Sequence, residues 1–487
     1  MPTLQKLSFA LFKNPMPTRN YLFYALTNSV CSKCLVKVEA KIIFQDDCVY
    51  LVKHCPTHGR EEVLIADDIE YYKKSLEFIK PGDMPLKFNT PIKYGCPYDC
   101  GLCPDHEQHS CLTLIEVTDK CNLSCPICYA DSGAEEVSPL SYQPRLHRSL
   151  AQIETMIDAV VANEGEPQIV QLSGGEPTIH PEFFQILDIV KTKPIKHLMI
   201  NTNGVMIAKD KSFCDRLSQY LPGIEIYLQF DSFEADALKE LRGADLRHVR
   251  EKAIANLNEY NISTTLVVTL KKGLNDHEIG KIIEFAVQHK CIRGVTFQPI
   301  QAAGRLAGFD PKRDRYTLTE VRRSILEQSP YFKPEDILPV PCHPDCLAMA
   351  YALKLNGKVI PLTGLINPDV FVNIMPNSVL YEQNEELKQQ IFQLFSTSHS
   401  PNSAALSLKQ LLCCLPMIAV PEGINYSNVF RVMIVQFLDP FNFDVRSVKR
   451  SCIHIVHPDG RIIPFDTFNM FYREGSAGYH LVNNRPA

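Results

Sequence analysis

The sequence contains no long apolar run and no excess of positive charge. No stretch of about 18 uninterrupted apolar residues occurs, so we expect no transmembrane helix. The 487 residues include 50 lysines and arginines and 55 acidic residues, and the net charge of −5 argues against a nucleic-acid partner. Residues 1–12 lack the apolar core and cleavage site of a secretory signal. We therefore expect a cytoplasmic protein.

Cysteine, by contrast, is abundant, with 18 in the chain. In a chain of this length without a secretory signal, many cysteines indicate metal binding in a reducing compartment rather than a disulfide framework. Most of them also fall into closely spaced pairs and triplets. An apolar content of 45% and a charged content of 22% are typical of a globular protein, and the length predicts two or three domains.

The most informative group is Cys121, Cys125 and Cys128, which follow a predicted strand over residues 112–117. Thiolates are the usual protein ligands of iron–sulfur clusters, and a cubane cluster takes four of them. Three closely spaced ligands leave one iron open to a molecule other than the protein. A structural zinc knuckle is the alternative interpretation.

A second group lies near the N-terminus, around an alternating stretch over residues 36–52 that predicts a β-hairpin with its turn at residues 45–47. Cysteine-x2-ligand corners flank this hairpin, as in tetrahedral sites for zinc or a single iron. The predicted ligands are Cys31, Cys34, Cys55 and either His58 or Cys48.

Two further groups carry the remaining candidate ligands. Residues 91–111 form a loop rich in proline and glycine, in which Cys96, Cys100, Cys103 and Cys111 can hold a complete second cluster or a zinc ion. We interpret His106 and His109 as polar loop residues, although either can replace a cysteine ligand. The last group comprises Cys342, Cys346 and Cys452, with a fourth ligand left open among Asp466, His454, Cys413 and a substrate. We assign Cys214, Cys291 and the Cys413–Cys414 pair to apolar packing.

Between these groups the chain alternates strands and helices. Strands are predicted over residues 112–117, 168–172, 197–200, 224–230, 264–270 and 294–299, with helices between them. This alternation predicts parallel β/α units, in which functional side chains gather at the C-terminal ends of the strands.

The cysteine loop Cys121-Asn122-Leu123-Ser124-Cys125-Pro126-Ile127-Cys128-Tyr129, followed by Ser173-Gly174-Gly175-Glu176-Pro177, resembles the signatures of the radical S-adenosylmethionine (SAM) superfamily. The resemblance implies that the three cysteines hold a [4Fe-4S] cluster. SAM binds the open iron, and reductive cleavage of SAM gives a 5′-deoxyadenosyl radical. The SAM-contacting residues implied in this way are Tyr129, Gly174, Gly175, Glu176, Asn201, Asn203, Gln229, Asp231 and Thr269. Arg242 and Lys272 are possible partners of the SAM carboxylate.

The resemblance also implies an architecture. We expect an N-terminal metal-knuckle domain over residues 1–90, similar to a rubredoxin or a zinc ribbon. A partial (β/α)6 radical SAM barrel over residues 91–320 follows, and then a C-terminal α+β domain over residues 321–487 with auxiliary [4Fe-4S] clusters and the substrate site. The order of motifs is similar to that in the branch containing the archaeal tetraether lipid synthase and proteins labelled dihydropterin methyltransferases. Asp466 and Ser451 stand where relatives are expected to carry cysteine.

These expectations lead to a functional hypothesis. The enzyme abstracts hydrogen from an unactivated carbon of a small-molecule or lipid-like substrate, for carbon–carbon coupling or methylation. Its electron comes from a reductase, a flavodoxin or a ferredoxin. The alternatives are a radical enzyme that modifies a peptide or a cofactor, and a non-catalytic iron–sulfur protein of electron transfer.

Overall fold

The computed structural model describes residues 19–79, 83–355, 358–361, 363 and 428–483. Cys413 and Cys414, with their predicted packing and the possible ligand role of Cys413, lie outside these residues. Among the described helices, none has the length and apolar character required to cross a membrane.

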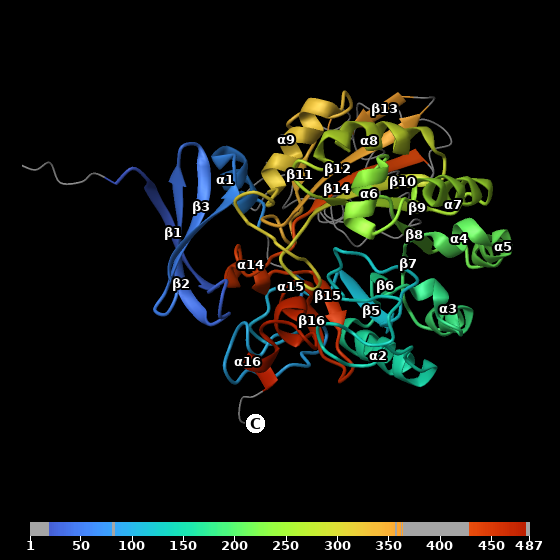
Figure 1. The fold of residues 1–487 in the computed structure, drawn as a ribbon, viewed down its shortest axis with the longest axis horizontal. Helices are drawn as coiled ribbons and strands as arrows, with labels where there is room; N and C mark the ends of the chain where they lie inside the picture. Colours follow the sequence, from blue (N-terminus) through green and yellow to red (C-terminus); the bar gives the residue numbers. More distant parts are fainter. Residues whose placement is uncertain (1–18, 80–82, 356–357, 362, 364–427, 484–487) are drawn as a thin grey trace, which may run out of the picture.

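The N-terminal unit is a four-stranded antiparallel sheet in the order β1-β2-β3-β4, followed by helix α1 (Ile69–Glu77) (Figure 1). Its strands are β1 (Leu22–Val30), β2 (Lys37–Gln45), β3 (Cys48–Cys55) and β4 (Gly59–Ala66). The predicted hairpin is β2–β3. Gln45 pairs with Cys48, and the two residues between them, Asp46 and Asp47, have φ values of 51° and 58°. This is the two-residue turn that matches the twist of paired strands.

The rest of the described chain is built on one twelve-stranded sheet. Six neighbouring parallel strands form the predicted barrel wall: β5 (Leu112–Thr118), β6 (Ile169–Gly174), β7 (His197–Thr202), β8 (Ile224–Gln229), β9 (Thr264–Leu270) and β10 (Ile292–Pro299). The C-terminal part of the chain adds a parallel strand at each edge of this set. Strand β14 (Val429–Val435) pairs with β10, and β15 (Ile453–Val456) pairs with β5.

Helices lie between consecutive barrel strands and bury their apolar faces against the sheet. In α2, for example, Ile153, Met156, Ile157 and Val160 are buried, as the sequence pattern predicts. Ser149 and Gln152 form a capping box that fixes where this helix begins. The barrel helices are α2 (Leu150–Glu164), α3 (Phe183–Lys191), α4 (Val205–Lys209), α5 (Lys211–Ser218), α6 (Ala235–Arg242), α7 (Arg247–Glu259), α8 (Ile279–Gln288) and α9 (Leu318–Gln328).

The C-terminal part extends the barrel sheet instead of building a sheet of its own. Antiparallel strands continue it at both edges: β11 (Leu338–Pro339), β12 (Leu347–Leu355) and β13 (Lys358–Pro361) beyond β14, and β16 (Ile462–Pro464) beyond β15. Short helices complete this part: α14 (Val445–Lys449), α15 (Phe465–Thr467), the segment Phe468–Tyr472 and α16 (Tyr479–Asn483). One apolar cluster includes Met433 of β14 and Ile455 of β15, so residues from both added strands contribute to a common core.

The N-terminal sheet is attached to the barrel by a buried lysine. The ammonium of Lys53, on β3, donates to the carbonyl oxygens of Pro440 at 2.6 Å and Phe441 at 3.0 Å. It also forms an ion pair with Glu61 at 3.2 Å. Burial lowers the pKa of Lys53, and Glu61 opposes this shift. The ion pair and the carbonyl bonds offset the cost of burying the charge at this junction.

Candidate active site and metal centres

The three cysteines of the loop after β5 line one cavity, at the C-terminal ends of the barrel strands. Residues from β6, β7, β8 and β9 and the loops that follow them complete its wall. The sequence-predicted SAM residues that line this cavity are Tyr129, Gly174, Gly175, Glu176, Asn201, Asn203, Gln229 and Thr269. Arg242, at the end of α6, lines it as well.

Asp231 is the one predicted SAM residue that does not line the cavity. It is fully buried and forms a bidentate ion pair with Arg242, at 2.8 Å to Nε and 2.6 Å to Nη2. Burial acts to raise the pKa of Asp231, but the Arg242 guanidinium outweighs it and lowers that pKa. Asp231 therefore positions the arginine that faces the cavity. Lys272 does not line the cavity, because it pairs with Glu320 at 2.6 Å.

Glu176 is held by hydrogen bonds on both carboxylate oxygens. Its side chain accepts from the backbone N–H groups of Asn203 at 2.7 Å and Thr178 at 3.1 Å, and from the hydroxyls of Thr202 at 2.7 Å and Thr178 at 2.5 Å. Burial raises the pKa of this carboxyl, and these donors oppose the shift. The result is an acidic side chain with a fixed orientation in the wall of the cavity.

Gly174 and Gly175, which precede Glu176, are needed because the backbone of residues 118–120 packs directly against them. A Cβ on Gly174 would lie 2.2 Å from the carbonyl oxygen of Thr118, and one on Gly175 would lie 2.0 Å from that of Lys120. The N–H of Gly175 donates to the Thr118 oxygen at 2.7 Å. Only glycine permits this approach, which sets the cysteine loop directly against the end of β6.

Arg305, whose role the sequence does not reveal, fixes the other side of the cysteine loop. Its backbone forms reciprocal hydrogen bonds with Cys128 at 2.8 and 3.0 Å. Its guanidinium donates to the carbonyl oxygens of Cys125 and Ser132, each at 2.7 Å, and pairs with Asp131 at 3.1 Å. The preceding Gly304 packs so closely that a Cβ there would lie 2.3 Å from the Cys128 oxygen. In the sequence, only the position of the Gly304-Arg305 pair shortly after the last barrel strand pointed to a contact with the cysteine loop.

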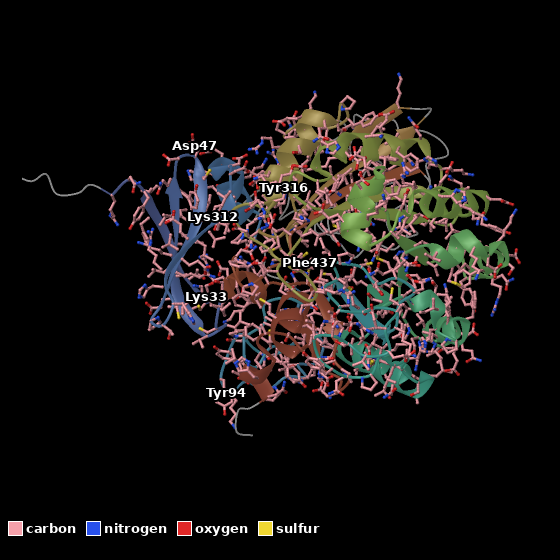
Figure 2. The ribbon with its side chains drawn as sticks, in the orientation of Figure 1. Lys33, Asp47, Tyr94, Lys312, Tyr316 and Phe437 are labelled. Atoms are coloured by element: carbon pink, nitrogen blue, oxygen red, sulfur yellow. The ribbon has the colours of Figure 1, made fainter. Side chains whose placement is uncertain are left out.

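An aromatic group separates the cavity from a second one inside the barrel. Phe437 and Phe465 stack with ring centroids 4.0 Å apart, and Tyr129 lies 5.0 Å from Phe465. Phe437 lies near the centre of the molecule in Figure 2. These three side chains line both cavities, together with Asn201 and Gln298. The inner cavity continues past apolar residues such as Leu114, Met199 and Met433.

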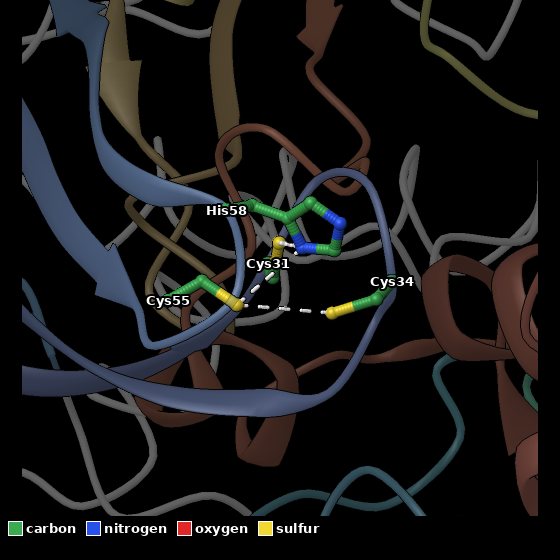
Figure 3. A group of neighbouring side chains, drawn as sticks. All are labelled: Cys31, Cys34, Cys55 and His58. Atoms are coloured by element: carbon green, nitrogen blue, oxygen red, sulfur yellow. Dashed lines mark hydrogen bonds between the residues drawn. The ribbon is translucent and has the colours of Figure 1, made fainter.

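The N-terminal sheet holds four potential metal ligands at one end (Figure 3). The ligand atoms of Cys31, Cys34, Cys55 and His58 all lie within 4.8 Å of one another. His58 Nδ1 lies 3.4 Å from the Cys31 sulfur and 3.5 Å from that of Cys55. Cys48 is not in this group because it begins β3, whereas Cys55 ends it. The geometry thus favours His58 over Cys48 as the fourth ligand of a tetrahedral ion.

The remaining cysteines are grouped differently from the expected pattern. Cys111 lies with Cys342 and Cys452, and the three sulfur atoms are within 4.8 Å of one another. The reason is strand pairing, since Cys111 directly precedes β5 and Cys452 precedes β15, its parallel neighbour. Cys346 contacts the hydroxyl of Ser447 at 3.3 Å instead.

Cys96 and Cys100 hydrogen-bond to each other, and neither is grouped with Cys111. Hydrogen bonding to Cys96 and burial both raise the pKa of the Cys100 thiol. Burial raises the pKa of the Cys103 thiol, and the charge of Cys96 adds to this shift. All three side chains are buried, and Thr467 donates to the Cys100 sulfur at 3.0 Å. Cys214 and Cys291 are also buried, within the barrel core.

Parts of the chain are similar to known families and proteins. Residues 115–286 match the model of the radical SAM superfamily, and residues 23–67 match an "HMPTM N-terminal zinc ribbon domain". A GTP 3′,8-cyclase from Syntrophomonas wolfei is 27% identical over 47% of this chain and 67% of its own. Among solved structures, Streptococcus suis SuiB bound to its precursor peptide SuiA aligns with a TM-score of 0.37 and 19% identity, covering 45% of each chain.

The fold and the three-cysteine site define a radical SAM enzyme. A relative from Methanocaldococcus jannaschii, described as 7,8-dihydro-6-hydroxymethylpterin dimethyltransferase, is 30% identical over 92% of this chain and 94% of its own length. The chain belongs to the family of this methyltransferase within the radical SAM superfamily.

The family uses a [4Fe-4S] cluster and SAM, and the residues of the cavity fit both groups. Three cysteines line the cavity and would give three thiolates to a cluster that takes four ligands. Glu176 and Arg242 offer charges complementary to the ammonium and carboxylate of an amino acid. The zinc ribbon adds a set of four ligands, three sulfurs and one nitrogen, which is suited to zinc or a single iron.

Replacing Arg305 with alanine should loosen the cysteine loop. The substitution removes hydrogen bonds to two carbonyl oxygens and the ion pair with Asp131, while the backbone bonds to Cys128 remain. We expect Arg305→Ala to bind the cluster iron incompletely after reconstitution, and Arg305→Lys to be intermediate because it lacks the planar fork. Iron and sulfide analysis per chain checks this, with exposed Arg247→Ala as control. Full cluster occupancy in Arg305→Ala would contradict the role.

The two candidate fourth ligands of the zinc ribbon can be separated by a matched pair of variants. His58→Ala should weaken zinc binding at this site by about 10-fold or more, because one of four tetrahedral ligands is lost. Cys48→Ser should leave the affinity unchanged. Zinc retention under competition with a chelator is the measurement. Equal loss in both variants, or loss only in Cys48→Ser, would overturn the assignment.

Proposed function

We propose that the enzyme begins catalysis by abstracting hydrogen from a carbon of a small molecule and that the product is methylated, with a flat heterocycle such as a reduced pterin as substrate. The observation that carries this proposal is the aromatic wall of Tyr129, Phe437 and Phe465, which lies next to the cysteine-lined cavity. Aromatic side chains stack on flat rings at little entropic cost. The pterin methyltransferase with 30% identity supports the same substrate class.

The protein's own residues act by binding and orientation. Cys121, Cys125 and Cys128 would hold the cluster, and Glu176 and Arg242 would bind the ammonium and carboxylate of SAM. Asn201, Asn203, Gln229 and Thr269 line the same cavity and would donate to or accept from the sugar of SAM. The cluster and SAM together supply the 5′-deoxyadenosyl radical. The barrel and aromatic wall keep water away and place a substrate carbon near it.

A second candidate is carbon–carbon coupling of a lipid-like chain. The apolar part of the inner cavity wall favours it, since Leu114, Met199 and Met433 would contact an alkyl chain, although Glu225, Tyr227 and Arg431 line the same cavity. In either case we propose that an electron enters from a reductase, a flavodoxin or a ferredoxin. We also propose that residues 1–90, 91–320 and 321–487 act as metal, radical and substrate regions.

Radical chemistry is tested by SAM cleavage. After anaerobic reconstitution and reduction, the wild-type enzyme should convert SAM to 5′-deoxyadenosine, and Cys125→Ala should fall to background because one iron loses its ligand. Cys214→Ala, which removes a buried packing cysteine, should retain cleavage. Chromatography measures the product. Iron binding without 5′-deoxyadenosine from the wild-type protein would favour the non-catalytic electron carrier.

Substrate class is tested by the aromatic wall. With a reduced pterin, Phe437→Ala should raise KM about 10-fold, the equivalent of the ~1.4 kcal/mol of one aromatic stacking contact. It should also lower the yield of methylated product per 5′-deoxyadenosine. Phe309→Ala is the control, because that ring lies against Phe441 and lines neither cavity. Turnover with an isoprenoid lipid and none with a pterin would support the second candidate.

A further inference from the structure

The three sulfur atoms of Cys111, Cys342 and Cys452 come from segments far apart in the chain. The Cys342 and Cys452 sulfurs lie 3.3 Å apart, and that of Cys111 is within 4.8 Å of both. A tetrahedral ion with sulfur ligands at ~2.3 Å holds its thiolates roughly 3.8 Å apart. The spacing is therefore that of metal ligands, and three thiols require a fourth partner to close the site.

The imidazole of His109 contacts one of the three thiols. Its Nε2 lies 3.4 Å from the Cys111 sulfur, and its Nδ1 lies 2.8 Å from the Glu164 carboxylate. Both side chains are largely buried, at 10% and 5% exposed. A carboxylate that accepts the Nδ1 proton fixes the tautomer whose Nε2 lone pair points at the thiols, the usual arrangement behind a metal-bound histidine.

The Glu164 carboxylate is itself held in place. It belongs to the last residue of α2, and its other oxygen accepts the backbone N–H of Ser110 at 3.1 Å. The carboxylate thus bridges the backbone and the ring of two consecutive residues just before Cys111. This bridge aligns the His109 imidazole with the strand that carries the first thiol.

Of the other fourth ligands considered from the sequence, Cys413 lies outside the described residues, and His454 and Asp466 contact other groups. His454 Nε2 lies 3.2 Å from the ring of His106, and the Asp466 carboxylate accepts the N–H of Leu438 at 2.6 Å. Both lie outside the group of thiols whose sulfur atoms are within 4.8 Å of one another, as His109 does, and His109 is distinguished from them by its 3.4 Å contact with the Cys111 sulfur. His106 is also engaged, at 2.9 Å from the Ser451 carbonyl oxygen.

We propose that His109, Cys111, Cys342 and Cys452 form a metal site of three thiolates and one imidazole, with Glu164 as the residue that positions His109. Its occupant is a thiophilic centre, either a single zinc or iron ion or an iron–sulfur cluster. Loading releases the thiol protons to solvent as the thiolates bind. The proposal does not rest on the reaction that the enzyme catalyses.

The position of the site suggests what it does for the fold. Cys342 follows β11 at one edge of the twelve-stranded sheet, whereas Cys111 and Cys452 precede β5 and β15 near the other edge. A bound metal therefore links the two edges of the sheet covalently. It also lies at the opposite end of β5 from the Cys121 loop, roughly 20 Å away for a strand of this length.

The test uses the full-length protein loaded either with zinc alone or with iron and sulfide. His109→Ala should lose one metal centre per chain relative to wild type, namely one zinc ion or the irons of one cluster, which identifies the occupant. His109→Cys should keep the centre but lose its nitrogen ligand, seen by X-ray absorption for zinc or by pulsed EPR for iron. Glu164→Gln should weaken retention against a chelator about 10- to 100-fold. His289→Ala, a histidine at the end of α8, is the control and should match wild type.

Two results would overturn the proposal. One is full occupancy in His109→Ala with an unchanged count of sulfur and nitrogen ligands. The other is a nitrogen signal from this centre that persists in His109→Cys, and this variant decides the question even if His109→Ala does not fold. The zinc ribbon contributes the same metal to every sample, since its ligands are intact in all variants.

Discussion

The close packing of the cysteine loop between two backbone segments is the contact on which the active site depends. On one side, Gly174 and Gly175 allow the carbonyl oxygens of Thr118 and Lys120 to approach the end of β6. On the other, Gly304 packs against the Cys128 carbonyl oxygen, and Arg305 forms hydrogen bonds with Cys128 and Cys125. A loop of this kind has no regular hydrogen-bonding partners of its own, so these contacts decide where the three thiols lie.

The rim of the cavity follows from the same parallel sheet. Side chains at the C-terminal ends of β7, β8 and β9 converge because parallel strands end at one edge. Buried charges then fix the positions of the polar groups that face the cavity. Asp231 holds Arg242 by a bidentate ion pair, and four donors hold Glu176. Preorganisation of this kind means that little rearrangement accompanies ligand binding.

The C-terminal part of the chain completes the barrel. Strands β14 and β15 flank the six-stranded wall, and Phe437 and Phe465 lie just after β14 and β16, where they close the cavity. The C-terminal part of the chain therefore contributes to the same cavity as the three-cysteine loop. This arrangement also brings Cys452 beside Cys111, two residues separated by most of the chain.

Much of the site could be predicted from sequence because its ligands are local. Spacings of four and three residues place Cys121, Cys125 and Cys128 on one loop. The alternation of strand and helix patterns predicts the six barrel strands, and the alternating stretch over residues 36–52 predicts the N-terminal hairpin. The choice of His58 over Cys48 needed the strand register, which places Cys48 at the start of β3 and His58 in the turn after its end. Only the tertiary structure decided three other features: the ion pair of Arg242 with Asp231, the hydrogen bonds of Arg305 to the cysteine loop, and the grouping of Cys111 with Cys342 and Cys452. Each depends on the pairing or packing of segments distant in sequence, and no local pattern of residues encodes which distant segments meet.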